Sequence, residues 1–315
     1  MFAVAVAGEG IALRRAGISG AILLLNFSDP ADLPAHIGYG LTPALYDFEQ
    51  AKAFAEASAR FVRPLPVHIK LDTGMGRLGF PPADLAKLAR LLSGARGLSV
   101  EGVFSQLASA QDFGSPATGS QLQAFRGALD ALAAAGLSAG MAHIANSAAA
   151  LTRPDSLFTA VRPGLALYGV LPWEGEEDRG NGGFEPAMTL ETRVMSVKRV
   201  AAGSPLGYGG AFVTRRPSTI AVLPIGYDDG LRRSFSGRVS VLLRGEGAPI
   251  VGAVSMDLTL VDATDCGAAA GDRVVCLGRV GDRRVTAWDL ARAAQTTPYE
   301  ILCGIGARVP RSYTP

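Results

Sequence analysis

Apolar strand-like runs alternate with helical segments from residue 2 to about residue 170, and this alternation constrains the fold more than any other feature. The runs cover residues 2–6, 21–25, 37–41, 67–72, 100–105, 141–145 and 160–168. Helical periodicity occupies residues 47–59, 82–93 and 120–135, and Gly136 supplies a stop signal. Such alternation predicts a parallel α/β fold. A closed β/α barrel needs eight strands, so either the sheet is open or one unit is absent.

The pattern changes after a polar, glycine-rich stretch at residues 173–187, which is typical of a domain boundary. Beyond it, strand-like runs joined by glycine-rich turns cover residues 189–201, 219–224, 238–243, 249–261 and 272–277, with one helix at 287–294. This pattern predicts a mainly-β second domain. We therefore expect two domains, residues 1–180 and residues 187–315.

Composition excludes several classes of function. Hydrophobic residues make up 48% of the 315 residues and charged residues 18%, which indicates a well-buried globular protein. A net charge of +2 without a dense Lys/Arg block predicts neither a nucleic-acid partner nor an anionic membrane partner. There is no membrane-length apolar run and no signal-peptide pattern at the start. Cys266, Cys276 and Cys303 are odd in number and indicate reduced core thiols, so we expect a cytoplasmic protein.

The segment from His68 to Phe80 joins an apolar strand to a glycine-punctuated turn that carries Arg77. Gly74 and Gly76 permit a tight turn at the carboxyl end of the strand. A guanidinium there is a candidate clamp for a carboxylate or a phosphate, because it meets either with two parallel hydrogen bonds. A surface turn with a solvated arginine is the alternative interpretation.

Two further strands also end in polar chemistry. His143 precedes Asn146 and Ser147, which form an N-cap pattern at a helix start, where a phosphate can bind. A plain helix cap is the alternative. Arg162 lies inside an apolar run followed by Pro163 and glycine, and burial of an arginine requires a dedicated partner. A structural salt bridge would also satisfy it.

The second domain contributes Gly207-Tyr208-Gly209-Gly210, a segment around Tyr227, and Ser255-Met256-Asp257. A tyrosine in a glycine turn can transfer protons, although most such tyrosines only pack and form hydrogen bonds. The three histidines are scattered and offer no metal-ligand cluster, so we expect no metal site, and a metal-dependent barrel hydrolase is a weaker alternative.

Taken in this order, the motifs resemble alanine racemase over essentially the whole chain. The shared segments are residues 70–77 (KLDTGMGR), 143–147 (HIANS), 162–169 (RPGLALYG), 207–210 (GYGG), 255–257 (SMD) and 308–311 (RVPR). The resemblance implies a TIM-type (β/α)8 barrel, here missing its first β/α unit, followed by a mainly-β C-terminal domain. It implies an amino-acid racemase, an isomerase that interconverts L-alanine and D-alanine through a pyridoxal-phosphate aldimine and supplies D-alanine for peptidoglycan.

The resemblance also implies how pyridoxal 5′-phosphate is bound. Arg162 would donate a hydrogen bond to the pyridine nitrogen and leave it unprotonated, with His143 supporting the arginine from behind. Ser147 and the backbone N–H groups around Gly164 and Leu165 would hold the phosphate.

The same resemblance implies the groups that handle the substrate. Tyr208 would be a proton-transfer residue that reaches the active site of the partner subunit in a head-to-tail homodimer. Arg77 and the backbone of Met256 would bind the carboxylate of a small amino acid. Asp257 would orient that region, and Tyr227 would line the entrance.

The chain departs from the family pattern in its lysines. Only Lys52, Lys70, Lys87 and Lys198 are present, and none lies in the Lys-Ala-Asn/Asp-Ala-Tyr-Gly-type segment that carries the cofactor in the family. Lys70 matches a family position that is often carbamylated, which would give it a negative charge that positions the carboxylate-binding arginine. Gln106 stands where the family usually has a histidine that stacks on the cofactor.

Alternatives remain open at this stage. A truncated racemase-like protein without the Schiff-base lysine would be catalytically inactive. Serine differs from alanine by one hydroxyl, and small pockets reject that difference poorly. Related cofactor-sharing barrels, such as basic amino-acid decarboxylases, are possible on fold analogy alone.

Overall fold

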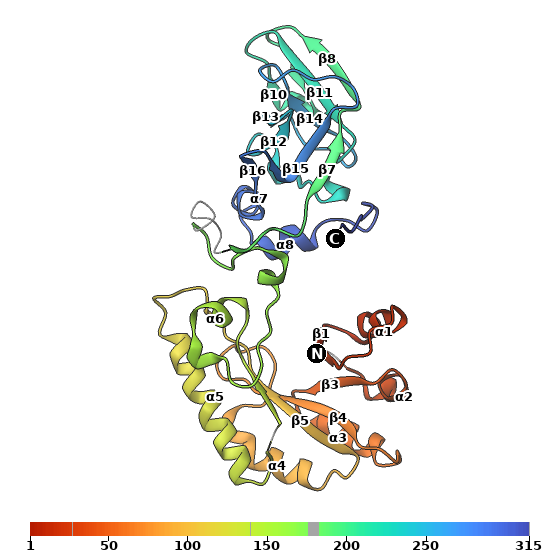
Figure 1. Cartoon of the computed structure of the whole chain (residues 1–315), viewed down its shortest axis with the longest axis vertical. Helices are drawn as coiled ribbons and strands as arrows, with labels where there is room; N and C mark the ends of the chain where they lie inside the picture. The colour runs from red at the N-terminus through yellow and green to blue at the C-terminus, as the bar shows by residue number, and fades with distance from the viewer. Residues whose placement is uncertain (27, 139, 176–182, 315) are drawn as a thin grey trace. The chain divides into compact units, whose positions relative to one another are not determined.

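A computed structural model describes residues 1–26, 28–138, 140–175 and 183–314 of the chain. The chain forms two compact units, Met1–Gly164 (unit 1) and Leu165–Pro315 (unit 2), which Figure 1 shows by colour. The domain limits expected from the sequence, 1–180 and 187–315, stay a prediction. Residues 176–182, within the glycine-rich stretch, lie outside the described residues.

Unit 1 contains one parallel sheet with its six strands in sequence order. The strands are β1 (Phe2–Val4), β2 (Ile22–Leu24), β3 (Leu41–Leu45), β4 (Leu65–Lys70), β5 (Leu98–Phe104) and β6 (Met141–His143). The helices are α1 (Ala7–Arg15), α2 (Leu33–Gly38), α3 (Phe48–Ser58), α4 (Leu85–Ser93), α5 (Ala117–Ala134) and α6 (Ser147–Thr152). The predicted barrel-type α/β fold is confirmed.

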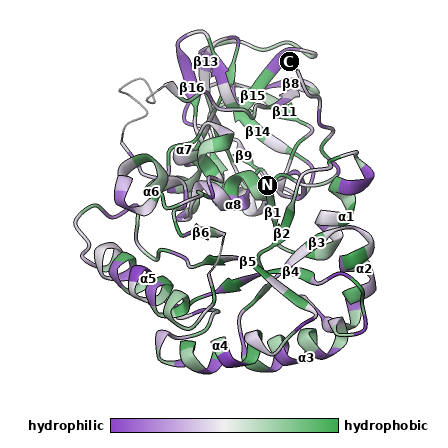
Figure 2. Cartoon of the chain, turned by 60° about the horizontal axis from the view of Figure 1, so that its bottom comes forward, coloured by the Kyte–Doolittle hydropathy of each residue, from purple (hydrophilic) through white to green (hydrophobic). Residues whose placement is uncertain are grey.

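Local sequence explains these elements. Every residue of β2 and β3 is buried, as expected for strands covered on both faces. Helix α4 buries Leu85, Leu88, Ala89 and Leu92, a helical spacing that turns one apolar stripe inward. Figure 2 shows α3, α4 and α5, with mixed polar and apolar colouring, covering one face of the largely apolar strands. The carboxyl ends of the strands are therefore held by a rigid scaffold.

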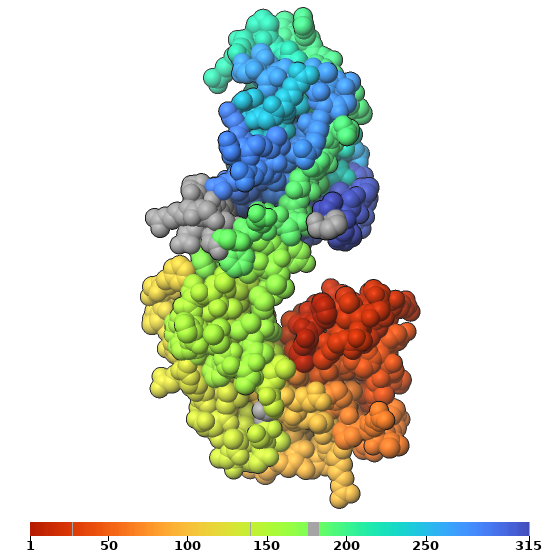
Figure 3. Space-filling model, in the orientation of Figure 1, coloured from red at the N-terminus to blue at the C-terminus, as the bar shows by residue number. Residues whose placement is uncertain are grey.

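Strands β1 and β6 form the two edges of this sheet among the described residues. Met1, Phe2 and Val6 are exposed at the first edge, and Figure 3 shows this N-terminal segment (red) at the surface of unit 1.

Two strand predictions in unit 1 were wrong. Residues 160–168 form no strand: Ala160 makes a single bridge with His143, and a 3₁₀ helix follows at Leu165–Tyr168. Pro163 has no N–H to donate to a ladder, which explains the early end. Residues 37–41 mostly belong to α2 and a turn at Gly40, whose φ of +58° favours glycine, so the strand starts only at Leu41.

Unit 2 is mainly β, as predicted. Its eight-stranded sheet runs β16-β15-β12-β13-β14-β11-β8, and β7 pairs with β15, while β9 and β10 form a separate hairpin. The strands are β7 (Leu190–Arg193), β8 (Ser196–Val200), β9 (Pro205–Leu206), β10 (Phe212–Val213), β11 (Ser218–Leu223), β12 (Ser240–Leu243), β13 (Glu246–Val251), β14 (Thr259–Asp262), β15 (Arg273–Val280) and β16 (Arg283–Val285). Two helices, α7 (Ala287–Ala294) and α8 (Pro298–Cys303), complete the unit.

Residues 249–261 form two strands rather than one. Gly252, with a φ of +69°, turns the chain after β13, and the segment from Ser255 to Asp257 lies in the loop that precedes β14. Residues 189–201 likewise divide into β7 and β8. The prediction of core thiols holds for Cys276, which is buried, but not for Cys303, which is exposed.

Each unit has its own apolar core, and this predicts the outcome of truncating large side chains. Phe125 in unit 1 and Phe235 in unit 2 are both fully buried. Replacing either by alanine should lower the free energy of unfolding by about 3–5 kcal/mol, because it removes apolar burial and leaves a cavity. Val62 is fully exposed, so Val62→Ala should change it by less than about 0.5 kcal/mol. Urea unfolding measures all three, and an equal effect of the three changes would contradict the assignment.

Candidate functional site

The ring of Phe104, at the end of β5, organises the polar side chains of unit 1. The His143 ring stacks on it at 4.9 Å between centroids and 4° between planes. The Arg162 Cζ lies 5.2 Å from the ring centroid, and the Lys70 Nζ lies 5.6 Å from it. Three predicted site residues are therefore brought together at the carboxyl ends of β4, β5 and β6.

Arg162 is held by hydrogen bonds to uncharged acceptors. Its Nη1 donates to His143 Nδ1 at 2.6 Å and to the His143 carbonyl at 3.0 Å. Its Nη2 donates to the Ser105 carbonyl at 2.6 Å and to Gln106 Oε1 at 3.0 Å, with a longer contact of 3.4 Å to the Ile144 carbonyl. Burial lowers the pKa of Arg162 to about 10, so it stays a cation at neutral pH. Among the described residues, no carboxylate forms an ion pair with it, so the salt-bridge alternative is not what holds it.

Lys70 is the last residue of β4 and is almost completely buried. Burial, and then the positive charges of Arg77 and Arg162, lower its pKa to about 8. A fraction of this amine is therefore uncharged near neutral pH, which makes it more nucleophilic than an exposed lysine.

The turn after β4 is organised by Asp72. Its Oδ1 accepts hydrogen bonds from the backbone N–H groups of Gly74, Met75 and Gly76 at 2.9–3.0 Å. Burial acts to raise the pKa of Asp72, but these three bonds outweigh it and hold the pKa below the usual value. The φ angles of Gly74 (+124°) and Gly76 (+68°) show that both glycines are needed, and Arg77 follows them with an exposed side chain.

The start of α6 has the expected N-cap. The Asn146 side chain accepts a hydrogen bond from the Ala149 N–H at 3.1 Å. The buried Ser147 hydroxyl accepts one from the Gly164 N–H at 2.9 Å, which joins this helix to the segment after Arg162. A Cβ at Gly164 would meet no atom within 4 Å, so the backbone there faces open space. Leu165, the other predicted backbone donor, is the first residue of unit 2 and is buried.

In unit 2, Arg308 connects three loop carboxylates. Its guanidinium pairs with Asp228 (3.0 Å), Asp229 (2.7 Å) and Asp257 (2.7 Å). These bonds raise the pKa of Arg308 above its already high ordinary value. The loop that contains Tyr227 and the loop that contains Met256 are thereby tied to one cation.

Backbone contacts join the same two loops. The Tyr227 N–H donates to the Ser255 carbonyl at 2.9 Å, and the Asp228 N–H donates to the Met256 carbonyl at 3.2 Å. A Cβ at Gly226 would lie 2.2 Å from the Met256 carbonyl oxygen, so this close approach requires glycine. Tyr227, Met256 and Asp257 are thus brought together, with Tyr227 and Met256 exposed.

Tyr208 lies in a turn that follows β9. It begins a short 3₁₀ turn at Tyr208–Gly210, after Gly207 with a φ of +73°, and its side chain is 70% exposed. The ring therefore projects from unit 2 into solvent.

Sequence reasoning missed three residues of these clusters. His68 lies on the same face of β4 as Lys70, two residues away, and this period-two spacing was the available signal. In the sequence, Phe104 has no feature that distinguishes it from an ordinary core residue. Arg308 was noted only as part of a motif, because its three partners are separated from it by 51 to 80 positions in sequence.

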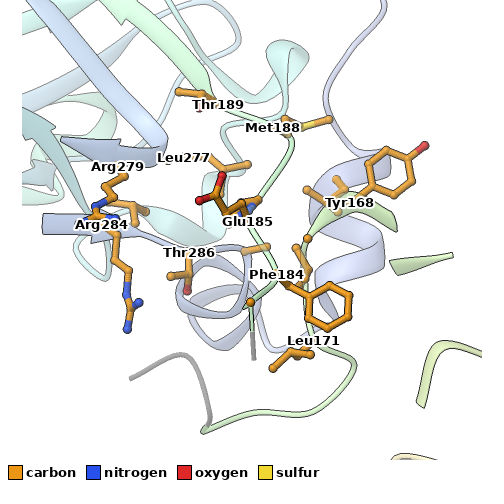
Figure 4. A pocket seen from close by; sticks show the side chains of 18 residues that line it. Tyr168, Leu171, Phe184, Glu185, Met188, Thr189, Leu277, Arg279, Arg284 and Thr286 are labelled. Atoms are coloured by element: carbon orange, nitrogen blue, oxygen red, sulfur yellow. The ribbon is translucent and has the colours of Figure 1, made fainter. Parts of the chain in front are cut away.

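Unit 2 also contains a cavity of about 480 Å³. Figure 4 shows Glu185, Arg279 and Arg284 among its lining residues. The described lining includes none of the predicted site residues. Within the described parts of the chain, no group of three His, Cys, Asp or Glu side chains could hold a metal ion, and no helix is long and apolar enough to cross a membrane.

The cluster in unit 1 is chemically suited to a phosphorylated heteroaromatic group. The four terminal guanidinium protons of Arg162 have protein acceptors, whereas no acceptor for its Nε–H occurs among the described residues. A ring nitrogen is a suitable acceptor for that proton, and Ser147 with the Gly164 backbone offers hydrogen bonds to a phosphate. These residues therefore fit such a group, although they contain no lysine in the sequence context of a cofactor anchor.

Comparison with known proteins gives a consistent result. A family model described as the N-terminal domain of alanine racemase matches residues 1–172, and one described as the C-terminal domain matches residues 187–313. Alanine racemase of Symbiobacterium thermophilum is 43% identical over 311 residues, which cover 98% of this chain and 82% of that protein. Alanine racemase of Syntrophobacter fumaroxidans is 40% identical over 306 residues, covering 97% and 81%.

Solved structures agree. Alanine racemase from the D-cycloserine-producing Streptomyces lavendulae has a TM-score of 0.94 at 37% identity, covering 99% of this chain and 83% of that chain. The Bacillus anthracis alanine racemase solved with bound L-Ala-P has a TM-score of 0.93 at 33% identity, covering 99% and 81%. Sequence, fold and both domain matches lead to one conclusion: this chain belongs to the alanine racemase family of amino-acid isomerases.

Proposed function

We propose that this protein interconverts L-alanine and D-alanine with pyridoxal 5′-phosphate as its cofactor. The observation that carries the proposal is Arg162, a half-buried cation whose terminal nitrogens are fixed by four hydrogen bonds, while its Nε–H has no acceptor among the described residues. Relatives at 40–43% identity carry the name alanine racemase, which supports alanine as the substrate. When bound, the cofactor supplies an electron-withdrawing ring that acidifies the substrate Cα–H.

Arg162 would set the electronic state of that ring. A guanidinium donates a hydrogen bond to the pyridine nitrogen but does not release its proton at neutral pH, so the nitrogen stays unprotonated and the ring withdraws fewer electrons. His143, which accepts from Arg162 at 2.6 Å, would keep the guanidinium in place. Ser147 and the Gly164 backbone would hold the phosphate, together with the Leu165 N–H.

Separate groups of residues would handle the substrate. Arg77 and the Met256 backbone would bind the carboxylate of the amino acid, because a guanidinium and a backbone N–H both donate to it. Lys70 would carry a carbamate, formed when its uncharged amine adds to CO₂ and releases a proton, and the resulting negative charge would position Arg77. The lowered pKa of Lys70, about 8, supports this modification.

Tyr208 would move a proton at the substrate Cα, and its exposure supports an action on a partner subunit in a head-to-tail homodimer. Asp257 would hold the Met256 loop through Arg308, and Tyr227 would line the entrance. The physiological role proposed is the supply of D-alanine for peptidoglycan in the cytoplasm.

Racemisation itself is the primary test. Incubation with L-alanine and pyridoxal 5′-phosphate should produce D-alanine, detected with a D-amino acid oxidase assay, and D-alanine should yield L-alanine. Borohydride reduction of the protein with the cofactor, followed by peptide mapping of the four lysines, tests for an imine, with the exposed Lys52 as reference. An adduct at Lys70 would exclude the carbamate, because a carbamylated nitrogen cannot form an imine. Cofactor binding without racemisation and without an adduct would favour the inactive alternative.

The phosphate contact is tested by Ser147→Ala. The change should weaken pyridoxal 5′-phosphate binding about tenfold, because it removes the hydroxyl that would donate to the phosphate and that orients the Gly164 N–H. Ser120→Ala is the matched control, since the Pro116 carbonyl is the one hydrogen-bond partner of that exposed hydroxyl within the described parts of the chain. Titration by absorbance measures both, and equal affinities for the two variants would contradict the assignment.

The buried imidazoles predict acid sensitivity. Burial, and then Arg162, lower the pKa of His68 to about 4 and of His143 to about 2. Below pH 6.5 the unfolded chain binds protons that the folded chain does not, so stability falls as the pH falls. In His68→Asn, the slope of the unfolding free energy against pH should be smaller by about 1 kcal/mol per pH unit between pH 5.5 and pH 4. Urea unfolding across this range measures it, and an unchanged slope would rule out a neutral His68.

A further inference from the structure

A second histidine lies behind the Arg162–His143 pair. His68 Nδ1 is 3.0 Å from His143 Nε2, across 75 residues of sequence. Both imidazoles are buried, at 0% and 2% exposure. His68 Nε2 is also buried, and it has no hydrogen-bond partner among the described residues. The three side chains form a chain of contacts that runs inward from the guanidinium.

The donor capacity of each group fixes where the protons lie. Arginine only donates, so His143 Nδ1 must accept from Arg162 with a free lone pair. His143 then carries its proton on Nε2, which faces His68. His68 Nδ1 must therefore accept in turn, and its own proton lies on Nε2. The contacts are satisfied only when both rings are neutral Nε2–H tautomers.

We propose that His68 is a positioning residue that selects the tautomer of His143 and thereby fixes the guanidinium of Arg162. The inference goes beyond the proposed function in assigning a role to His68, and it rests on that function only for the use made of Arg162. Without an acceptor at the position of His68 Nδ1, His143 would lose the partner for its buried Nε2–H. Its other tautomer would direct a proton toward the guanidinium, which cannot accept it.

The surroundings of His68 keep its acceptor in place. A Cβ at Gly102 would lie 2.3–2.7 Å from three atoms of the His68 ring, so the absence of a side chain on β5 makes room for it. Phe104 packs beside it at 6.5 Å between ring centroids. The His68 ring therefore packs closely against the β5 backbone at Gly102. The lowered pKa values of both histidines agree with two neutral rings.

The tautomers can be read directly by ¹⁵N NMR of the imidazole nitrogens in the full-length protein without cofactor. His68 and His143 should each show a protonated Nε2 and an unprotonated Nδ1 throughout pH 6 to 8. His36 is the internal reference, because neither of its buried ring nitrogens has a partner among the described residues. A proton on Nδ1 of His143, or a doubly protonated His68, would overturn the proposal.

A matched pair of variants tests the positioning. Asparagine and leucine have the same shape, but only His68→Asn keeps an acceptor near the Nδ1 position. The guanidinium protons of Arg162 should exchange as slowly in His68→Asn as in the unaltered protein and at least tenfold faster in His68→Leu, because a lost buried hydrogen bond costs roughly this factor. Equal exchange in the two variants would show that His68 only fills space and would refute the proposal.

Circular dichroism and urea unfolding establish that both variants fold. If His68→Leu does not fold, the tautomer measurement on the unaltered protein still decides the question. Neither readout requires bound cofactor or racemisation, so failure of this inference is distinguishable from failure of the proposed function.

Discussion

The half-buried position of one arginine, with no carboxylate partner among the described residues, is the constraint on which the site in unit 1 depends. A cation in an apolar environment needs compensation, and here the compensation comes from the carbonyl groups of Ser105 and His143, the Gln106 side chain and an imidazole. These acceptors lie at the carboxyl ends of β5 and β6. The geometry of the site is therefore set by the register of the parallel sheet, and the helices that cover the sheet keep that register.

The site residues of unit 2 are held by a different kind of interaction. Arg308 is exposed and forms ion pairs with three carboxylates. The strength of these ion pairs depends on their geometry and their number, because exposed pairs do not benefit from a low dielectric. The close backbone approach at Gly226 adds a steric requirement. Loops are thus fixed by a half-buried cation with neutral acceptors in unit 1 and by an exposed cation with charged acceptors in unit 2.

Local sequence signals predicted local structure well. Gly136 follows the end of α5, Asn146 caps α6, and the glycines around Met75 form the expected turn. Each of these features depends on the backbone preference of one residue and its neighbours. The strand expected at 160–168 failed, since an apolar run is ambiguous and Pro163 weakened it. The contact of Arg162 with His143 was expected from the family resemblance. The contact of Arg162 with Gln106, across 56 positions, and that of His68 with His143, across 75, could not be predicted, because these residues meet only when the sheet forms.

The chain of contacts behind Arg162 has a consequence for ligand affinity. An arginine side chain has about 2 kcal/mol of rotamer entropy, which is lost when its conformation is fixed. In this protein both terminal nitrogens of Arg162 are already fixed by acceptors at the ends of the strands. The entropy is therefore lost when the protein folds, and it does not reduce the free energy of ligand binding. A ligand that accepts a hydrogen bond from the Nε–H binds to a preorganised donor. The preorganisation strengthens ligand binding at the expense of the stability of the folded protein.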